Sequence, residues 1–371
     1  MIMSMRLKKL LALSLSVSLV STGIFVDVGM RSVTAAASKT KQAKDKKNVK
    51  KVKVTVAQKK TIKAPKSEKK AVWSILSGKQ NISVIKKGKG EIKIKAQKSG
   101  SVKLQAKQGK KKTIYNITVK KQAPKKSEIK QLTKFYKECF IKSSKEMGNN
   151  WYADGDDFLH DKWIEWDDYG YIRGMSLEAK EILTEINLPW FKKIQYFGSV
   201  TGNNLKSIDL GNNPTLKYFF LDVGYGESAE ENYPYLNKID FSGCQNLEGV
   251  YINSVFNIKQ IDLSNNRKIK TVNISHTPLD ELKMPKTDCL KEVYMNWSKI
   301  NELDLSNCTN IQKIGIIGCN PQSVTISLGN KTDKEISEFD IDVYSADVET
   351  SVRFVANREI SEVPKVRYEY G

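Results

Sequence analysis

Residues Ile258–Ile274 read "IKQIDLSNNRKIKTVNI", and they place apolar side chains at the same spacing twice in succession. With Ile258 as position 1, positions 1, 4 and 6 hold Ile, Ile and Leu, and eleven residues later they hold Ile, Val and Ile. Positions 4 and 6 alternate as in a short strand, so their side chains point to one side. A pattern that returns at a fixed period predicts stacked units that bury a common core.

The same unit recurs through most of the second half of the chain. Its first positions are Leu205, Leu216, Leu236, Leu247, Ile258, Ile269, Leu279, Leu290, Ile300 and Ile311. Weaker copies are placed at Phe191 and Pro321. The steps between units are 10 or 11 residues, except for one step of 20. The longer step contains Asp222–Tyr235, which we expect to protrude from the stack.

Two kinds of unit alternate, one with sequences such as "IDLSNN" and "LDLSNC" and one with "VYINSV" and "VYMNWS". Over about residues 183–328 this alternation resembles the short, nested leucine-rich repeats of bacterial proteins. The resemblance implies a solenoid in which about 21 residues make one coil. It also implies that position 9, which takes Asn, Cys or Thr in such repeats, serves the backbone inside each turn.

Three of the five cysteines, Cys244, Cys308 and Cys319, fall at position 9. By the same resemblance they are residues of a buried ladder with free thiols. The alternative for an odd number of cysteines in a secreted chain is a disulfide framework with one spare thiol.

Position 5 lies between two inward residues and is therefore expected to face solvent. In one kind of unit it is mostly Asp, and we interpret these carboxylates as acceptors of N–H groups in the following turn. In the other kind it holds Phe220, Tyr251, Asn273, Tyr294 and Gly315. Such an aromatic column either covers the sheet by stacking or binds a ligand. The candidate ligand-binding residues are Tyr218, Phe220, Tyr225, Tyr233, Tyr251, Tyr294 and Trp297.

The first 37 residues predict a secretory signal peptide. Basic residues precede an apolar run at positions 10–26, and the small residues of "VTAAAS" follow it. A retained anchor is the alternative, but the run is short for a spanning helix and is interrupted by serines. We therefore expect a bacterial protein that is secreted or on the cell surface, with no transmembrane segment after signal removal.

Residues 51–121 alternate apolar and polar side chains in six or seven short stretches, among them "KVKVTV", "EIKIKA" and "TIYNITV". This pattern predicts a two-sheet β-sandwich, with Trp73 as the core aromatic residue. The segment resembles the group 2 bacterial Ig-like domains, on the residues "VKVTVAQKKTIKA", "VWSIL", "SGSVKLQAK" and "YNITVKK". The resemblance implies a spacer or adhesion module.

Charge is divided unequally along the chain. Residues 38–130 contain 31 lysines and four acidic residues, a net charge of +27, within a chain of net charge +21. The lysines either solvate the strands or attract an anionic cell-wall polymer. Nucleic acid is not the expected partner, because the protein is predicted to be exported and its lysines are spread over all strands.

Between the two repeating regions, Ile129, Leu132, Phe135, Tyr136 and Phe140 have helical spacing and predict an amphipathic helix. The stretch "WDDYGYIRGMS" is similar to a calcium loop, but Ser176 stands where a bidentate Glu is needed, so we expect a solvated acidic cap and no metal site.

The predicted fold class is a multidomain chain with an Ig-like β-sandwich followed by a leucine-rich-repeat solenoid. The expected boundaries are 1–37 for the signal peptide, 38–50 for a disordered Lys-rich linker, 51–121 for the sandwich, 122–190 for a helical cap, 191–328 for the repeats and 329–371 for a C-terminal β cap.

No set of residues predicts an enzyme, a metal site or a cofactor. The two histidines are far apart in the sequence, and no GxSxG, HExxH or P-loop motif occurs. The first hypothesis is therefore a cell-surface binding or adhesion protein that engages an extracellular protein or glycan. A structural cell-wall protein without a specific ligand is the second. A glycan-active enzyme is the third, because the acidic stretch at residues 154–168 mixes carboxylates with aromatic rings.

Overall fold

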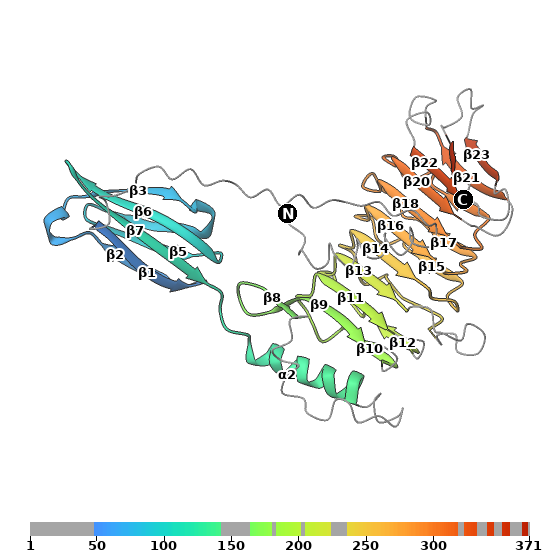
Figure 1. The fold of residues 1–371 in the computed structure, drawn as a ribbon, viewed down its shortest axis with the longest axis horizontal. Coiled ribbons are helices and arrows are strands. Elements are labelled where there is room, and N and C mark those ends of the chain that lie inside the picture. Colours follow the sequence, from blue (N-terminus) through green and yellow to red (C-terminus); the bar gives the residue numbers. More distant parts are fainter. Residues whose placement is uncertain are drawn as a thin grey trace. The chain divides into compact units, whose positions relative to one another are not determined.

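The computed structural model describes residues 48–141, 164–179, 183–201, 205–223, 236–317, 323–331, 340–344, 351–356 and 366–369. These residues divide into two compact units (Figure 1). The first unit contains residues 48–128 and Trp166–Tyr171, and the second unit contains the other described residues. The expected signal peptide, most of the Lys-rich linker and the segment 142–163 lie outside the described residues.

Two sheets form the first unit. One has the order β1-β7-β6-β3, with β1 Val49–Thr55, β3 Val72–Ser77, β6 Gly100–Gln108 and β7 Lys111–Lys120. The other has the order β2-β5-β4, with β2 Lys59–Lys63, β4 Ile82–Lys87 and β5 Glu91–Ala96. Alternate residues of both sheets enter one core, in which Trp73 is buried as predicted and its ring centroid lies 5.1 Å from that of Tyr115.

The turn Trp166–Tyr171 belongs to the first unit and uses both of its aspartates. The Asp168 carboxylate accepts hydrogen bonds from the N–H and the hydroxyl of Ser99, at 2.8 and 2.7 Å. The Asp167 carboxylate accepts the N–H groups of Tyr169 and Tyr171. The acidic turn therefore fixes backbone in this unit, and it is less solvated than the sequence predicts.

A ten-stranded sheet runs through the second unit in the order β24-β22-β20-β18-β16-β14-β13-β11-β9-β8 (Figure 1). From β9 to β24 all neighbouring strands are parallel. The strands are β8 Ile164–Trp166, β9 Ile172–Ala179, β11 Tyr196–Thr201, β13 Tyr218–Asp222, β14 Gly249–Asn253, β16 Thr271–Ser275, β18 Glu292–Asn296, β20 Lys313–Ile317, β22 Asp340–Tyr344 and β24 Val366–Glu369.

A second set of parallel strands, most of them three residues long, alternates with these along the chain. They are β10 Glu185–Asn187, β12 Ser207–Asp209, β15 Gln260–Asp262, β17 Glu281–Lys283, β19 Glu302–Asp304, β21 Ser323–Gly329 and β23 Ser351–Ala356. They form three separate sheets, β10-β12, β15-β17 and β19-β21-β23. Residues 236–240, between β12 and β15, are not in a strand.

The predicted fold class is wrong in its caps and in its solenoid. Within the described part of residues 122–190 there is one short α-helix, α2 Lys126–Phe135, which continues as a π-helical turn at Tyr136–Ile141. The rest of that range contributes the strands β8, β9 and β10, and in β9 the buried Met175 and Leu177 alternate with polar residues as in a strand. The structure shows no clear solenoid, since the short strands form three sheets instead of one wall.

The expected C-terminal cap also differs from the prediction. Strands β22 and β24 pair in parallel with β20 and β22, so they extend the ten-stranded sheet instead of closing it. The weak unit at Pro321 is displaced by two residues, because Ile326 pairs with Leu303, which is a position 4. Ser323 therefore takes position 1.

The core positions of the repeated unit are confirmed. Ile258, Ile261 and Leu263 are fully buried, and the same positions are buried in the neighbouring units. The side chain at position 9 serves the backbone, as expected. Buried Asn266 donates to the carbonyls of Phe241 and Cys244, at 3.0 and 2.9 Å.

The thiols of Cys244 and Cys308 are buried and unbridged, as predicted, and Cys319 lies outside the described residues. Burial raises the pKa of Cys244 to about 12 and that of Cys308 to about 11. Among the described residues, none of the helices has the length and apolar character needed to cross a bilayer.

Candidate functional site

The outward face of the ten-stranded sheet carries most of the candidate residues in two rows. One row follows the register Phe220↔Tyr251↔Asn273↔Tyr294↔Gly315 and confirms that these residues lie on one line. The next row follows Tyr196↔Tyr218↔Gly249↔Thr271↔Glu292↔Lys313. We call Tyr196, Tyr218, Tyr251 and Tyr294 the tyrosine strip. Tyr196 is buried, with 5% exposure, and supports the strip from one end, whereas the other three rings are partly exposed.

Phe220 is not an exposed binding residue, contrary to the prediction. Its side chain is only 3% exposed, although it occupies the same row as Tyr251. Gly198 stands beside it in the sheet, and a Cβ at Gly198 would lie 3.8 Å from the Phe220 ring. The ring thus lies against the sheet where a neighbouring side chain is missing. Tyr225 and Tyr233 lie outside the described residues.

Stacked rings and an arginine fix the first part of the strip. The rings of Tyr196 and Tyr218 are 5.5 Å apart and nearly parallel, with 6° between their planes. Arg173 lies over the Tyr196 ring at 5.0 Å and donates to its hydroxyl at 2.9 Å. Cation–π and stacking contacts of this kind hold aromatic side chains in one orientation.

Two glycines leave room for the rings to lie flat on the sheet. A Cβ at Gly249 would come within 2.9 Å of the Tyr218 ring and 3.1 Å of the Tyr251 ring. A Cβ at Gly315 would come within 2.6 Å of the Tyr294 ring. The ammonium group of Lys313 lies over the Tyr294 ring, 5.8 Å from its centre. The absence of side chains at these two positions therefore shapes the strip.

Glu248 connects the strip to two lysines from other units. Its carboxylate accepts hydrogen bonds from Lys217 and Lys270, both at 2.8 Å, and from the Tyr218 hydroxyl at 3.2 Å. Burial alone would raise the pKa of the Glu248 carboxyl, but the bonds and charges of the two lysines lower it to about 2. Glu248 is therefore a fixed anion at neutral pH, with only 13% of its side chain exposed.

The tyrosine hydroxyls near this cluster stay protonated at neutral pH. Burial, followed by the charge of Glu248, raises the pKa of Tyr218 to about 12. Burial also raises the pKa of Tyr251, although a hydrogen bond with Thr271 acts in the opposite direction. Tyr218 and Tyr251 consequently present neutral rings with hydroxyl groups, and Tyr218 lies beside the fixed charge of Glu248.

Trp297 lies beyond the carboxyl end of β18, and with 39% of its side chain exposed it is the most accessible predicted ring among the described residues. It stacks on His276 at 5.9 Å with 12° between the planes. Ser254, His276 and Trp297 follow successive strands and have φ angles of 57°, 48° and 53°. This left-handed conformation is unfavourable for such residues. The N–H groups of Ser254 and His276 still donate to carbonyl groups of the next strand in the sheet, those of Ser275 and Asn296, which continues the ladder by one residue.

The aspartates at position 5 of the other kind of unit are turn residues, as predicted. Asp209, Asp240, Asp262 and Asp304 each accept the N–H two residues ahead, at 2.8 to 2.9 Å. The hydrogen bonds from Ser242 and Ser264 lower the pKa of Asp240 and of Asp262, respectively. These carboxylates stabilise turns, and the structure gives them no further role.

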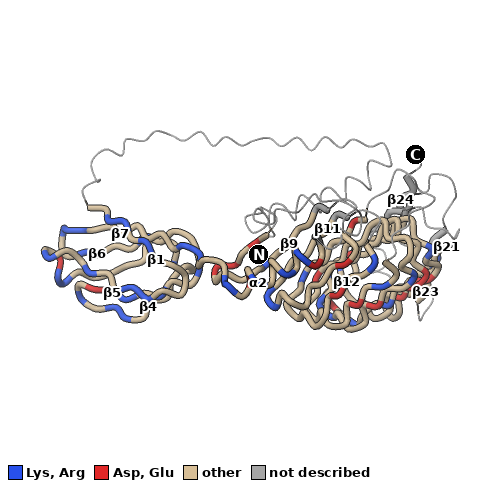
Figure 2. Tube along the Cα trace, turned by 90° about the horizontal axis from the view of Figure 1, so that it is seen from below, with Lys and Arg blue, Asp and Glu red and all other residues tan. Residues whose placement is uncertain are grey.

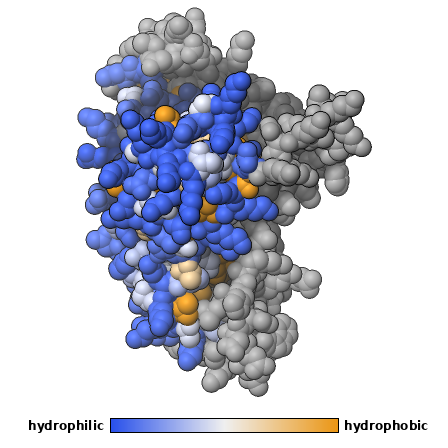
Figure 3. Space-filling model, turned by 90° about the vertical axis from the view of Figure 1, so that its left-hand side faces the viewer, coloured by the Kyte–Doolittle hydropathy of each residue, from blue (hydrophilic) through white to orange (hydrophobic). Residues whose placement is uncertain are grey.

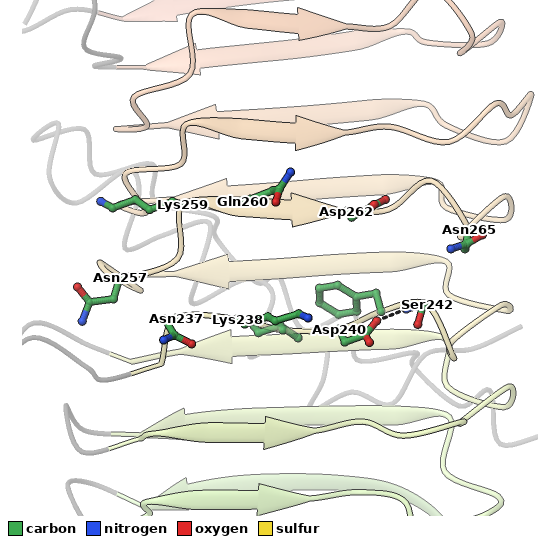
Figure 4. A pocket seen from close by; sticks show the side chains of 11 residues that line it. Asn237, Lys238, Asp240, Ser242, Asn257, Lys259, Gln260, Asp262 and Asn265 are labelled. Carbon is green, nitrogen blue, oxygen red and sulfur yellow. Dashed lines mark hydrogen bonds between the residues drawn. The ribbon is translucent and has the colours of Figure 1, made fainter.

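An open hollow of about 670 Å³ lies between Asp240 and Asp262, where the short-strand side lacks a strand. In Figure 4 its polar side chains come from the units that begin at Leu236 and Ile258 and from Asn257, which precedes the second of these, and a hydrogen bond joins Asp240 and Ser242. The other labelled residues are Asn237, Lys238, Asn257, Lys259, Gln260, Asp262 and Asn265. The hollow has no aromatic ring except the buried Phe241, so the tyrosine strip is the stronger candidate site.

Sequence reasoning missed half of the site. It named Tyr218 but followed position 5, so it overlooked Tyr196, the partner of Tyr218 at position 3, and position 2, which carries Lys217, Glu248 and Lys270. It also placed a weak unit at Phe191, whereas Tyr196 pairs with Tyr218 and Ile194 therefore takes position 1. Comparing all outward positions between units would have revealed the stacked pair.

Comparisons with known proteins identify no relative. No protein-family model, no curated protein and no solved structure matches the chain.

Proposed function

We propose that this chain is an extracellular binding protein whose tyrosine strip engages a protein or glycan ligand. The observation that carries the proposal is the tyrosine strip on the outward face of a parallel sheet, in which Tyr218 stacks on Tyr196 and bonds to Glu248, while Tyr251 and Tyr294 lie partly exposed in the next row. A face that only solvates the sheet needs no ordered rings, and aromatic residues at protein surfaces are typical of binding sites.

The strip is suited to binding because its side chains are already ordered. Tyrosine offers a large ring and one hydroxyl group and has only two side-chain torsions to restrict. Arg173 and Glu248 restrict these rings further through bonds to the hydroxyls of Tyr196 and Tyr218. Ordering before binding lowers the entropic cost of association.

Binding is a better proposal than catalysis at this site. A general acid or base works best when its pKa is near the working pH. Glu248 has a pKa of about 2 and Tyr218 one of about 12, so neither exchanges a proton readily at neutral pH. Their roles are to position side chains.

The extracellular location is part of the proposal and rests on the sequence. The first 37 residues have the order of a signal peptide, and residues 51–121 resemble bacterial Ig-like domains of surface proteins. A cell-wall structural role without a specific ligand is the alternative, but it gives no reason for the ordered rings.

The proposal is tested on an array of cell-envelope glycans and purified extracellular proteins probed with labelled protein. The wild type is compared with Tyr251→Ala/Tyr294→Ala and with a control on the other side, Lys238→Ala/Asn265→Ala. We expect specific signals from the wild type that the tyrosine variant loses and the control retains. If the tyrosine variant and the wild type give the same pattern, the strip is not the binding surface.

A further inference from the structure

The outward face of the three-stranded sheet in the first unit is covered by lysines. Lys59, Lys63, Lys86, Lys93 and Lys95 are all exposed, and they come from all three strands of β2-β5-β4. We call these five residues the lysine face. Figure 2 shows the blue Lys and Arg positions along β4 and β5. The surface that faces the viewer in Figure 3 is mostly hydrophilic.

Like charges stand directly opposite one another on the lysine face. Lys59 pairs with Lys95, and Lys86 pairs with Lys93. Opposed like charges destabilise a sheet, since side chains at such positions are only about 5 Å apart. Glu91, opposite Lys63, is the single acidic residue in these strands. Among the described residues, no carboxylate forms an ion pair with the lysine face.

The four-stranded sheet of the same unit shows that this arrangement is not required for solubility. There Lys53 stands opposite Thr118, while Lys51 and Lys103 stand on either side of Asn116. One lysine pair, Lys107 with Lys112, occurs close to a hairpin turn. Lysines opposite neutral polar residues solvate a sheet without repulsion, so the pairing on the lysine face calls for another cause.

The chemistry of the face indicates the class of ligand. Residues 38–130 contain no arginine, and lysine acts as a point charge without the planar fork that reads single carboxylate or phosphate groups. The face also has no aromatic ring on which bases would stack. It is therefore suited to a polymer with closely repeated single charges.

We propose that the lysine face binds a linear polyphosphodiester of the cell envelope. A chain of phosphates next to the paired lysines removes their mutual repulsion and releases counterions. The proposal rests on the extracellular location proposed above but is independent of the tyrosine strip. If the tyrosine strip fails its test, the lysine face can still bind its polymer, and the reverse also holds, because the two surfaces use different residues on different units.

The test measures binding of the full-length protein to synthetic poly(glycerol phosphate) of fixed length, over a range of salt concentrations. The face variant is Lys59→Gln/Lys86→Gln/Lys93→Gln/Lys95→Gln. The control, Lys51→Gln/Lys53→Gln/Lys103→Gln/Lys120→Gln, removes the same number of charges from the four-stranded sheet. We expect the face variant to lose about tenfold or more in affinity and to show a salt dependence that is shallower by about 3, and the control to stay within about threefold.

Thermal unfolding of both variants separates binding from folding. The face variant should be at least as stable as the wild type, because it loses repulsive pairs. Equal losses in both variants would show an effect of net charge alone, and no binding by the wild type would show that the lysines only solvate; either result overturns the proposal. Single-stranded DNA with the same number of phosphates should bind no more tightly than the polymer, and binding about tenfold tighter would assign the face to nucleic acid instead.

Discussion

At the scale of single residues, Glu248 organises the candidate site. It belongs to position 2 of its unit, yet its carboxylate bonds to Lys217 in the unit that begins at Leu216 and to Lys270 in the unit that begins at Ile269, which supply the two neighbouring strands of the sheet. Hydrogen bonds between ionised groups contribute about 1.5 to 3 kcal/mol when they are buried, and the bond to Lys270 contributes less because half of that side chain is exposed. The residue thus links three units and fixes the Tyr218 hydroxyl at the same time.

The lowered pKa of Glu248 predicts a loss of stability in acid. A carboxyl group whose pKa is about 2 in the folded protein and about 4.3 in the unfolded chain stabilises the fold above pH 4.3. This contribution, about 1 to 3 kcal/mol, disappears as the pH falls from 4.3 towards 2. We expect the unfolding temperature of Glu248→Gln to fall less between pH 4.3 and pH 2 than the unfolding temperature of the wild type.

Glu281→Gln is the matched control for that measurement. Glu281 also pairs with a lysine, Lys283, but at 3.6 Å and with about half of each side chain exposed. Exposed pairs of this kind contribute little. If both variants respond to acid in the same way as the wild type, the Glu248 cluster does not stabilise the fold.

The cysteines give a second prediction at this scale. Cys244 and Cys308 are fully buried with raised pKa values, whereas Cys289 is partly exposed. Because the thiolate is the reactive form, an alkylating reagent at pH 8 should modify Cys289 first, and the other two only on unfolding. Peptide mass spectrometry follows each site. Early modification of Cys244 or Cys308 in native protein would contradict their burial in the turns.

At the scale of elements, the repeated unit was predictable where one residue decides the local structure. The apolar positions 1, 4 and 6, the side chain at position 9 and the turn-forming aspartates depend on neighbours within a few residues, and all three are as expected. The strands that replace the expected helical cap were not predictable in this way, because β9 acquires its partner, β11, only in the assembled sheet. Burial of Phe220 likewise depends on the strands on either side of it, β11 and β14, which come from other units.

A turn variant tests how strongly position 9 supports its element. Asn266→Ala removes two hydrogen bonds to buried carbonyl groups, those of Phe241 and Cys244, and should lower the free energy of unfolding by about 2 to 3 kcal/mol. The neighbouring Asn265 is exposed, so Asn265→Ala should change it by less than about 0.5 kcal/mol. Chemical denaturation measures both, and equal effects would show that the amide of Asn266 does not serve the backbone.

At the scale of the whole molecule, two units carry two unlike surfaces. The first presents paired lysines, and the second presents ordered tyrosines beside fixed charges. The unequal distribution of charge was visible in the sequence, since 31 of the lysines lie in residues 38–130. The sequence did not reveal which sheet carries opposed lysines, because the register between strands is set only in the folded sheets.

The most direct test of the central claim measures the affinity of the tyrosine strip for the ligand that binds most tightly on the array. Isothermal titration compares the wild type with Tyr251→Ala/Tyr294→Ala and with Lys238→Ala/Asn265→Ala. If the strip is the binding surface, the tyrosine variant should lose about 2 to 4 kcal/mol of binding free energy, a factor of about 30 to 1,000, and the control should stay within about threefold. A tyrosine variant that binds within about threefold of the wild type, with its thermal stability unchanged, would contradict the account.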